Sequence, residues 1–290
     1  MTSGTPHSGT SDLPPSDTGH SATPKRRPRW VLPVGIVVGL VALVIVGLLA
    51  WTLWRPVLGG DYSKVHNRSQ ELLTKHRDEV MFQVVQVAQS ESPDPADNET
   101  KVDAMMQVVR DYGTQVEELS QERAFSDSEV AEAYRPVSEA VNSYRTFLTD
   151  WGASVPPVKH MQRVCHEFDK ANAYMDRGAT GESFDAAAAE CKAAVEQAGE
   201  VKVQDGIVQA RATYLQERRA AWQLNGEARS SGRIDREKNR QAIRAEHEAT
   251  NAWQQADQKA AGEVATEIEN GSQRVVTAWE EFGRVVEAKS

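Results

Sequence analysis

The residues with the clearest chemistry in this chain are its two cysteines, Cys165 and Cys191. They lie equally far on either side of Gly178, where a turn between two helices is expected. Positions equidistant from the turn of an antiparallel helical hairpin meet at the same height, and an even cysteine count in an external domain favours a disulfide. The sequence therefore predicts a Cys165–Cys191 bond, which closes a loop of about 26 residues and contributes about 3–4 kcal/mol to stability.

Two alternatives to the disulfide stay open. His160 and His166 lie close to Cys165, so the cysteines could belong to a metal site, although their spacing matches no common zinc pattern. The cysteines could also be two buried free thiols. We expect the disulfide and no metal site.

No motif for catalysis or cofactor binding is present in the sequence. It has no glycine-rich phosphate loop and no G-x-S-x-G, and no histidine follows a glutamate by three positions, as di-iron bundles require. Glu246-His247-Glu248 differs from the H-E-x-x-H of metalloproteases. Trp253 lies in a polar stretch and is either a core residue or a ring on which a ligand stacks. We therefore expect a non-enzymatic protein without a cofactor.

The longest uncharged segment lies near the N-terminus, where residues 30–54 are mostly Val, Leu, Ile, Ala and Gly. A helix of this length measures about 37 Å and can cross a hydrocarbon core of about 30 Å. Trp30, Trp51 and Trp54 lie at its two ends, where indole rings prefer the headgroup layer. We predict a retained single transmembrane helix, because the apolar run is longer than that of a secretory signal and no small-x-small cleavage site follows.

Basic residues indicate the orientation of this helix. Lys25, Arg26, Arg27 and Arg29 directly precede it, and clustered basic residues tend to stay on the cytoplasmic side. The chain after the helix is acidic, with 40 Asp and Glu against 29 Lys and Arg. This balance disfavours nucleic acid as a partner, because such binding depends on cations that neutralise phosphates.

These features divide the chain into four parts. Residues 1–29, rich in Ser, Thr and Pro before their basic end, form a cytoplasmic tail that we expect to be disordered. The transmembrane helix (30–54) and a short Pro- and Gly-containing hinge (55–61) follow. Residues 62–290 form an extracytoplasmic α-helical domain.

Apolar residues recur in this domain at steps of three and four, a pattern typical of amphipathic helices, and no strand-like alternation is sustained. We therefore predict an all-α fold, with the transmembrane helix followed by an external helical bundle. A corner is expected at residues 151–157, which contain a Trp-Gly and a Pro-Pro pair. The predicted helices span residues 62–89, 99–123, 126–148, 158–175, 182–228, with a possible break at 199–206, and 235–288.

The last predicted helix, 235–288, would reach about 75 Å and is polar in its first half. A helix that long needs a partner along much of its length. The segment 208–222 is the natural antiparallel partner. We predict that the two form a long, protruding, coiled-coil-like arm whose tip lies near Ser231.

Small residues within the transmembrane helix indicate one possible contact. Gly35 and Gly39 form a G-x-x-x-G, a spacing at which two membrane helices can approach closely. A homodimer is therefore possible, through this motif or through the arm. The other expected partners are the lipid bilayer and an envelope protein.

The layout as a whole consists of a Ser/Thr/Pro-rich tail, the segment Lys25-Arg26-Arg27-Pro28-Arg29-Trp30, a Val/Gly/Leu span and an Ala- and Glu-rich external part. It resembles single-pass envelope proteins of actinobacteria. The resemblance implies a cell-membrane location and supplies no activity and no site residues.

We expect a membrane-anchored extracytoplasmic scaffold or interaction protein of the cell envelope. The alternative is a sensory or ligand-binding helical bundle. That function would require a separate signalling partner, because the cytoplasmic tail has no room for an output domain.

The predicted topology can be tested by fusing alkaline phosphatase after Ser290. The fusion should be active in cells, because this enzyme needs disulfides that form only in an oxidising compartment. A fusion truncated at residue 24 is the control and should be inactive. An inactive fusion after Ser290 would reverse the orientation.

Overall fold

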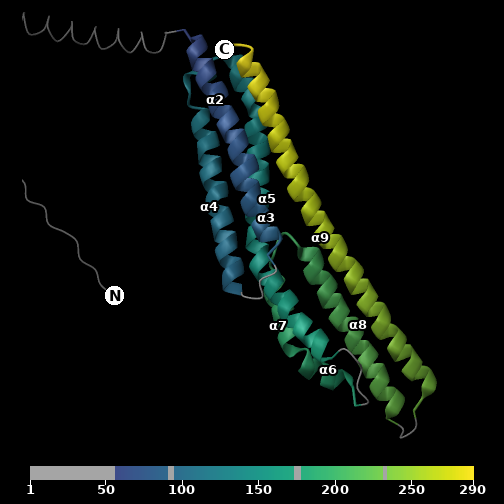
Figure 1. Ribbon diagram of the computed structural model, residues 1–290. Coiled ribbons are helices and arrows are strands. Elements are labelled where there is room, and N and C mark those ends of the chain that lie inside the picture. Colours follow the sequence, from purple (N-terminus) through teal and green to yellow (C-terminus); the bar gives the residue numbers. More distant parts are fainter. Residues whose placement is uncertain (1–55, 91–94, 173–177, 231–233) are drawn as a thin grey trace, which may run out of the picture. The chain divides into compact units, whose positions relative to one another are not determined.

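The computed structural model describes a helical unit that begins at Val57 (Figure 1). Among the residues that it describes, there is no strand. The all-α prediction is therefore confirmed for this part of the chain. The described ranges are 56–90, 95–172, 178–230 and 234–290.

The predicted tail and transmembrane helix, residues 1–29 and 30–54, lie outside the described residues. Among the helices that the structure does describe, none combines the length and the apolar character needed to cross a bilayer. The membrane anchor therefore stays a prediction from the sequence. The residues that carry it, all outside the described ranges, are Lys25, Arg26, Arg27, Arg29, Trp30, Gly35, Gly39, Trp51 and Trp54.

Long α-helices alternate with a few short ones in the described unit (Figure 1). Apart from the break at Ala188 and the π-helical turn, the breaks between them fall where prolines, glycines and small polar residues interrupt the amphipathic pattern. In chain order the elements are α2 (Gly59–Lys75), a π-helical turn (His76–Val80), α3 (Met81–Ala88), α4 (Pro95–Leu119), a 3-10 turn (Arg123–Ser126), α5 (Ser128–Ala171), α6 (Gly181–Ala187), α7 (Ala189–Ala198), α8 (Asp205–Arg229) and α9 (Arg236–Glu287).

The first core is formed by α2, α3, α4, part of α5 and the C-terminal part of α9. Trp279 on α9 is almost fully buried in it. Its indole Nε1 donates to the hydroxyl of Tyr112 at 2.7 Å, and its ring packs edge-on against Tyr134. The apolar stripes predicted from the sequence supply most of this core, including Val65, Leu72, Val80, Val84, Met105, Val109, Val116, Val130, Val137, Val141 and Val275.

The second core is formed by the later part of α5 together with α6, α7, α8 and the N-terminal part of α9. As predicted, α8 and α9 lie side by side (Figure 1). However, α8 also packs against α6 and α7, so the two helices are not a free-standing arm. Phe184 on α6 explains the difference, because its ring packs edge-on against both Phe168 of α5 and Trp222 of α8.

One face of α9 is shielded along nearly the whole helix. Its members follow steps of four and three that give an 11-residue period, about 3.67 residues per turn. This period is close to that of a straight α-helix, so a single unbroken helix can serve both cores. The face is small and polar in the second core and apolar in the first, and consists of Glu246, Ala249, Trp253, Asp257, Ala260, Val264, Ile268, Gly271, Val275, Trp279, Phe282 and Val286.

α5 also passes through both cores, and this corrects the corner predicted at residues 151–157. The two prolines there each remove one helix hydrogen bond. Packing outweighs this loss, because Trp151 and Val155 are buried in the first core and Val158 is buried in the second. The helix therefore continues across the prolines.

The predicted hinge at residues 55–61 is shorter than expected, because α2 begins at Gly59. Asp61 stabilises this early start. Its carboxylate accepts a hydrogen bond from the backbone N–H of Leu58 at 3.0 Å, at a helix end where backbone N–H groups lack internal partners.

The π-helical turn between α2 and α3 places a histidine inside the first core. His76 is fully buried, with its ring 5.6 Å from that of Tyr112 and 5.8 Å from that of Tyr144. Nε2 is 3.0 Å from Ser272 Oγ, whereas Nδ1 has no hydrogen-bond partner among the described residues. Burial lowers the pKa of His76 to about 4, so the fold accommodates the neutral ring.

His76 should make the fold less stable in acid. The pKa is about 6.5 in the unfolded chain and about 4 in the fold, so the unfolded state takes up the proton first. The free energy of unfolding is therefore highest above about pH 6.5 and falls by up to about 3 kcal/mol as the pH is lowered to about 4. Urea unfolding across this range measures it. The non-titrating variant His76→Gln should show a flatter pH dependence, and an unchanged slope would contradict the assignment.

Two glycines of α9 offer a matched test of the packing. A Cβ at Gly271 would clash with the Tyr144 ring, whereas a Cβ at Gly262 would meet nothing within 4 Å. Gly271→Ala should therefore lower the free energy of unfolding by about 1–3 kcal/mol. Gly262→Ala should raise it by up to about 1 kcal/mol, because alanine favours the helix. Equal effects in denaturant titrations would show that α9 is not held against α5.

Candidate functional site

The disulfide joins α5 to α7 within the second core. The Sγ atoms of Cys165 and Cys191 are 1.96 Å apart and their Cα atoms 4.7 Å apart, and both residues are buried. The structure therefore contains the pair that the sequence predicted. The neighbouring His166 is exposed, and His160 contacts Arg163 at 3.4 Å. The described ranges hold no group of three or more His, Cys, Asp or Glu side chains suited to a metal ion.

α8 contributes two buried arginines, Arg211 and Arg218, and Arg211 Nη2 lies 3.8 Å from Cys191 Sγ of this disulfide. Each is 2% exposed. Arg211 Nη2 donates to a carboxylate oxygen of Asp169 at 2.7 Å and to the carbonyl of Cys165 at 2.9 Å. Arg218 donates to the other oxygen of Asp169 at 2.9 Å and also to Glu246. A single carboxylate therefore bridges two guanidinium groups.

This charged cluster connects three helices, since Asp169 belongs to α5, the two arginines to α8 and Glu246 to α9. Two positive groups face two negative groups, and buried charges need such pairing to be tolerated. The hydroxyl of Tyr214 also donates to Asp169 at 3.1 Å. Burial raises the pKa of Tyr214 to about 12, so this tyrosine is a neutral donor near pH 7.

A cavity of about 240 Å³ lies beside the cluster, lined by residues of α5, α8 and α9. Arg211 and Trp253 both line it, and the guanidinium carbon of Arg211 lies 5.0 Å from the centre of the Trp253 ring. Arg211 Nε is buried and has no hydrogen-bond partner among the described residues. This is unusual, because buried donors in folded proteins nearly always have a partner.

Asp257 of α9 supplies a carboxylate to the same cavity. It accepts a long hydrogen bond, 3.4 Å, from the side-chain amide of Gln162. Within the described ranges it has no ion-pair partner. The cavity is therefore lined by a guanidinium-bearing residue, an aromatic ring and a carboxylate.

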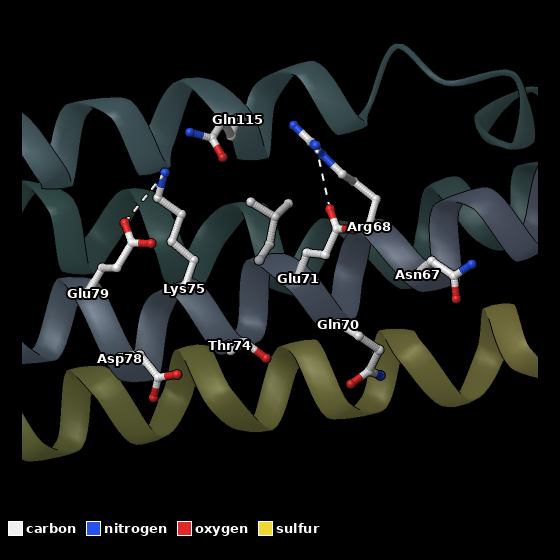
Figure 2. Close-up of a pocket in the computed structure, with 10 residues that line it drawn as sticks. Asn67, Arg68, Gln70, Glu71, Thr74, Lys75, Asp78, Glu79 and Gln115 are labelled. Atoms are coloured by element: carbon white, nitrogen blue, oxygen red, sulfur yellow. Dashed lines mark ion pairs between the residues drawn. The ribbon is translucent and has the colours of Figure 1, made fainter.

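The largest hollow among those described is a different one, and it has the character of an ordinary solvated surface. It measures about 720 Å³ and is lined by polar side chains of α2 and the π-helical turn, with Gln115 from α4. Figure 2 shows two local ion pairs among its charges, Arg68 with Glu71 at 3.5 Å and Lys75 with Glu79 at 3.7 Å, and Asp78 outside both pairs. These exposed pairs leave no convergent group for a ligand, so we place the candidate site at the cavity beside the disulfide.

The sequence indicated part of this site in advance. It predicted the disulfide and gave Trp253 a possible role in ligand stacking, but it did not single out Asp169, Arg211 or Arg218. A signal was present, because the two arginines are seven residues apart and fall within the apolar stripe of α8. Charged residues in such a stripe must be buried with partners.

Comparison with known proteins adds no assignment, because no family model, no curated protein and no solved structure matches the chain. The functional interpretation therefore depends on the sequence and on the geometry of the described residues.

Removing the bridging carboxylate should destabilise the second core strongly. Asp169→Ala leaves two buried guanidinium groups short of a partner, and we expect a loss of about 3–5 kcal/mol in the free energy of unfolding. The control is Glu139→Ala, which breaks a pair with Arg135 whose side chains are 64% and 72% exposed. This change should cost less than about 1 kcal/mol. Similar losses for both variants in urea titrations would refute the bridging role of Asp169.

Proposed function

We propose that this chain is a membrane-anchored, extracytoplasmic interaction protein of the cell envelope that acts as a scaffold and not as an enzyme. The predicted transmembrane helix at residues 30–54 and the basic cluster before it support the anchor and its orientation. The Cys165–Cys191 disulfide supports an oxidising location for the helical unit, since such bonds persist outside the cytoplasm.

The observation that carries the scaffold role is the length and continuity of α9. This helix has 52 residues, about 78 Å at 1.5 Å per residue, and packs against both cores. A straight helix held along its length is suited to hold partners at a fixed distance from a surface. The end of α9 returns to the start of α2, where Lys289 and Tyr62 both bind the carboxylate of Asp127 at 2.9 Å.

In this proposal the chain leaves the membrane shortly before α2, because the predicted anchor precedes α2 in sequence. We expect partners to bind along the sides of the helical unit. Phe82 and Val85 support one such contact, because they lie one turn apart on α3 and are 56% and 38% exposed.

A ligand-binding or sensory role is the second candidate. It is favoured by one observation, the cavity of about 240 Å³ whose lining includes Arg211, Trp253 and Asp257. A binding site there would lie in the second core, separate from the exposed pair on α3. This role would need a separate signalling partner in the membrane.

Site-specific photo-crosslinking in native membranes tests the scaffold role. A photoreactive residue in place of Phe82 should give one discrete adduct, because this apolar side chain is open to a partner. An adduct of twice the chain mass would indicate a homodimer, and any other single mass an envelope partner. Gln241 on α9, exposed but polar, provides the control position and should give none. A complete lack of adducts at position 82 would contradict the proposal.

A further inference from the structure

We propose that mild acid opens the packing of α2, the π-helical turn and α3 against the C-terminal part of α9, through the protonation of His76. The opening is local and leaves the second core folded. Because α3 carries Phe82, the same step weakens the partner contact proposed above. This regulatory part of the inference rests on the proposed scaffold function, whereas the opening itself does not.

His76 is the contact between these elements that a proton changes most. Its Nε2 lies 3.0 Å from Ser272 Oγ of α9, and the residue is fully buried. A neutral imidazole carries one N–H, whereas the protonated ring carries two and a positive charge. Nδ1 has no hydrogen-bond partner among the described residues, so the second N–H would lack an acceptor inside the core. The protonated ring regains hydration only by leaving the core.

Two neighbouring polar contacts to α9 respond differently to acid. Arg77 pairs with Glu280 at 2.7 Å, but both side chains are about half exposed, so the pair adds little to the closed state. His66 Nδ1 lies 3.3 Å from the carbonyl oxygen of Gly283. A protonated His66 still donates to that carbonyl, so acid leaves this contact in place.

The groups that face His76 offer no compensating negative charge. α4 contributes Tyr112 and α5 contributes Tyr144, and burial raises the pKa of both hydroxyls, so both are neutral. α9 contributes Ser272, which does not titrate. On the π-helical turn itself, the positive charge of Arg77 further opposes protonation. None of the described contacts of His76 is to a carboxylate, so an ion pair does not stabilise a proton on the buried ring.

The opening is local because the two cores differ in the groups that acid can reach. His76 lies in the first core, where α2 and the C-terminal part of α9 meet. The second core is held by the Cys165–Cys191 disulfide and by arginines paired with carboxylates. None of the buried residues described there is a histidine. A proton taken up by His76 therefore acts on one core alone.

α3 is attached to the same place. The π-helical turn leads directly into α3 at Met81, and π-helical segments are rare and often lie at functional sites. The Tyr144 hydroxyl donates to Met81 Sδ at 3.3 Å, and the Tyr144 ring lies 5.8 Å from that of His76. Loss of His76 from the core therefore removes support from the start of α3, where Phe82 and Val85 are exposed.

Hydrogen exchange of the full chain in detergent, measured by mass spectrometry at pH 7 and pH 5, tests the opening. Asp and Glu keep their charge at pH 5, so histidines are the side chains that gain a proton. The pKa of His76 is about 4 when closed and about 6.5 when open, so opening becomes more favourable as the pH falls. After correction for intrinsic rates, exchange in residues 76–88 and 268–280 should rise about 20-fold at pH 5, whereas residues 207–222 of α8 should not change.

Matched histidine variants assign the effect to one ring. His76→Gln retains a side-chain hydrogen-bonding group for Ser272 but does not titrate, so it should abolish the rise in exchange. His66→Gln, the same change on α2, should leave the rise intact. If His76→Gln does not fold, the exchange map of the natural chain still decides the question. A rise spread evenly over both cores, or no rise in residues 76–88, would overturn the inference.

Photo-crosslinking in native membranes tests the regulatory part. With a photoreactive residue in place of Phe82, the adduct formed at pH 7 should weaken at pH 5, and adding His76→Gln should restore its yield. Equal yields at both pH values would refute the regulation and leave the scaffold role standing. A lack of adducts at either pH would contradict the scaffold role and the regulation together, while hydrogen exchange still decides whether the packing opens.

Discussion

The continuous shielded face of α9 is the constraint on which the rest of the described unit depends. Two separate cores form on opposite stretches of this one helix, with α5 as the other shared element. Because the face repeats with a period close to that of a straight helix, neither core forces α9 to break. Of the other helices, α2 and α8 pack against α9, α4 and α7 pack against α5, and the short α3 and α6 pack against α4 and α8.

The two stretches of α9 are packed by different kinds of residue. The first core is apolar and aromatic around Trp279, and its apolar packing accounts for most of its stabilisation. The second core contains small residues on α9 and the bridged Arg211–Asp169–Arg218 cluster. Buried ion pairs contribute little net stability, but they disfavour alternative packings that would leave a charge unpaired. The second core therefore gains specificity, and the cavity beside it contains polar groups that a purely apolar core would lack.

Much of the fold could be predicted from the sequence because amphipathic spacing is a local property. The apolar stripes of α2, α4 and α9 were predicted from three- and four-residue steps alone, and a possible break before α8 from Gly199 and Gly206. The continuity of α5 through Pro156 and Pro157 could not be predicted, since it depends on packing from distant helices that compensates for lost hydrogen bonds. The covering of α8 by α6 and α7 has the same origin.

The candidate site was predictable only in part. The cysteine pair could be inferred from equal distances to a turn, and Trp253 was singled out because it stands alone in a polar stretch. The pairing of Arg211 with Asp169 joins residues 42 positions apart, so no local pattern reveals it. The predicted anchor at residues 30–54, in contrast, is supported by the length and composition of that segment alone.

A distance measurement along α9 tests the central claim most directly. Spin labels at the exposed positions Gln241 and Glu281, attached through introduced cysteines, are separated by 40 residues of one helix. A continuous α9 predicts a single narrow distribution of distances near 60 Å, at about 1.5 Å per residue. A broad distribution, or a maximum well below this value, would show that α9 bends or breaks between the two cores and would contradict the role assigned to it.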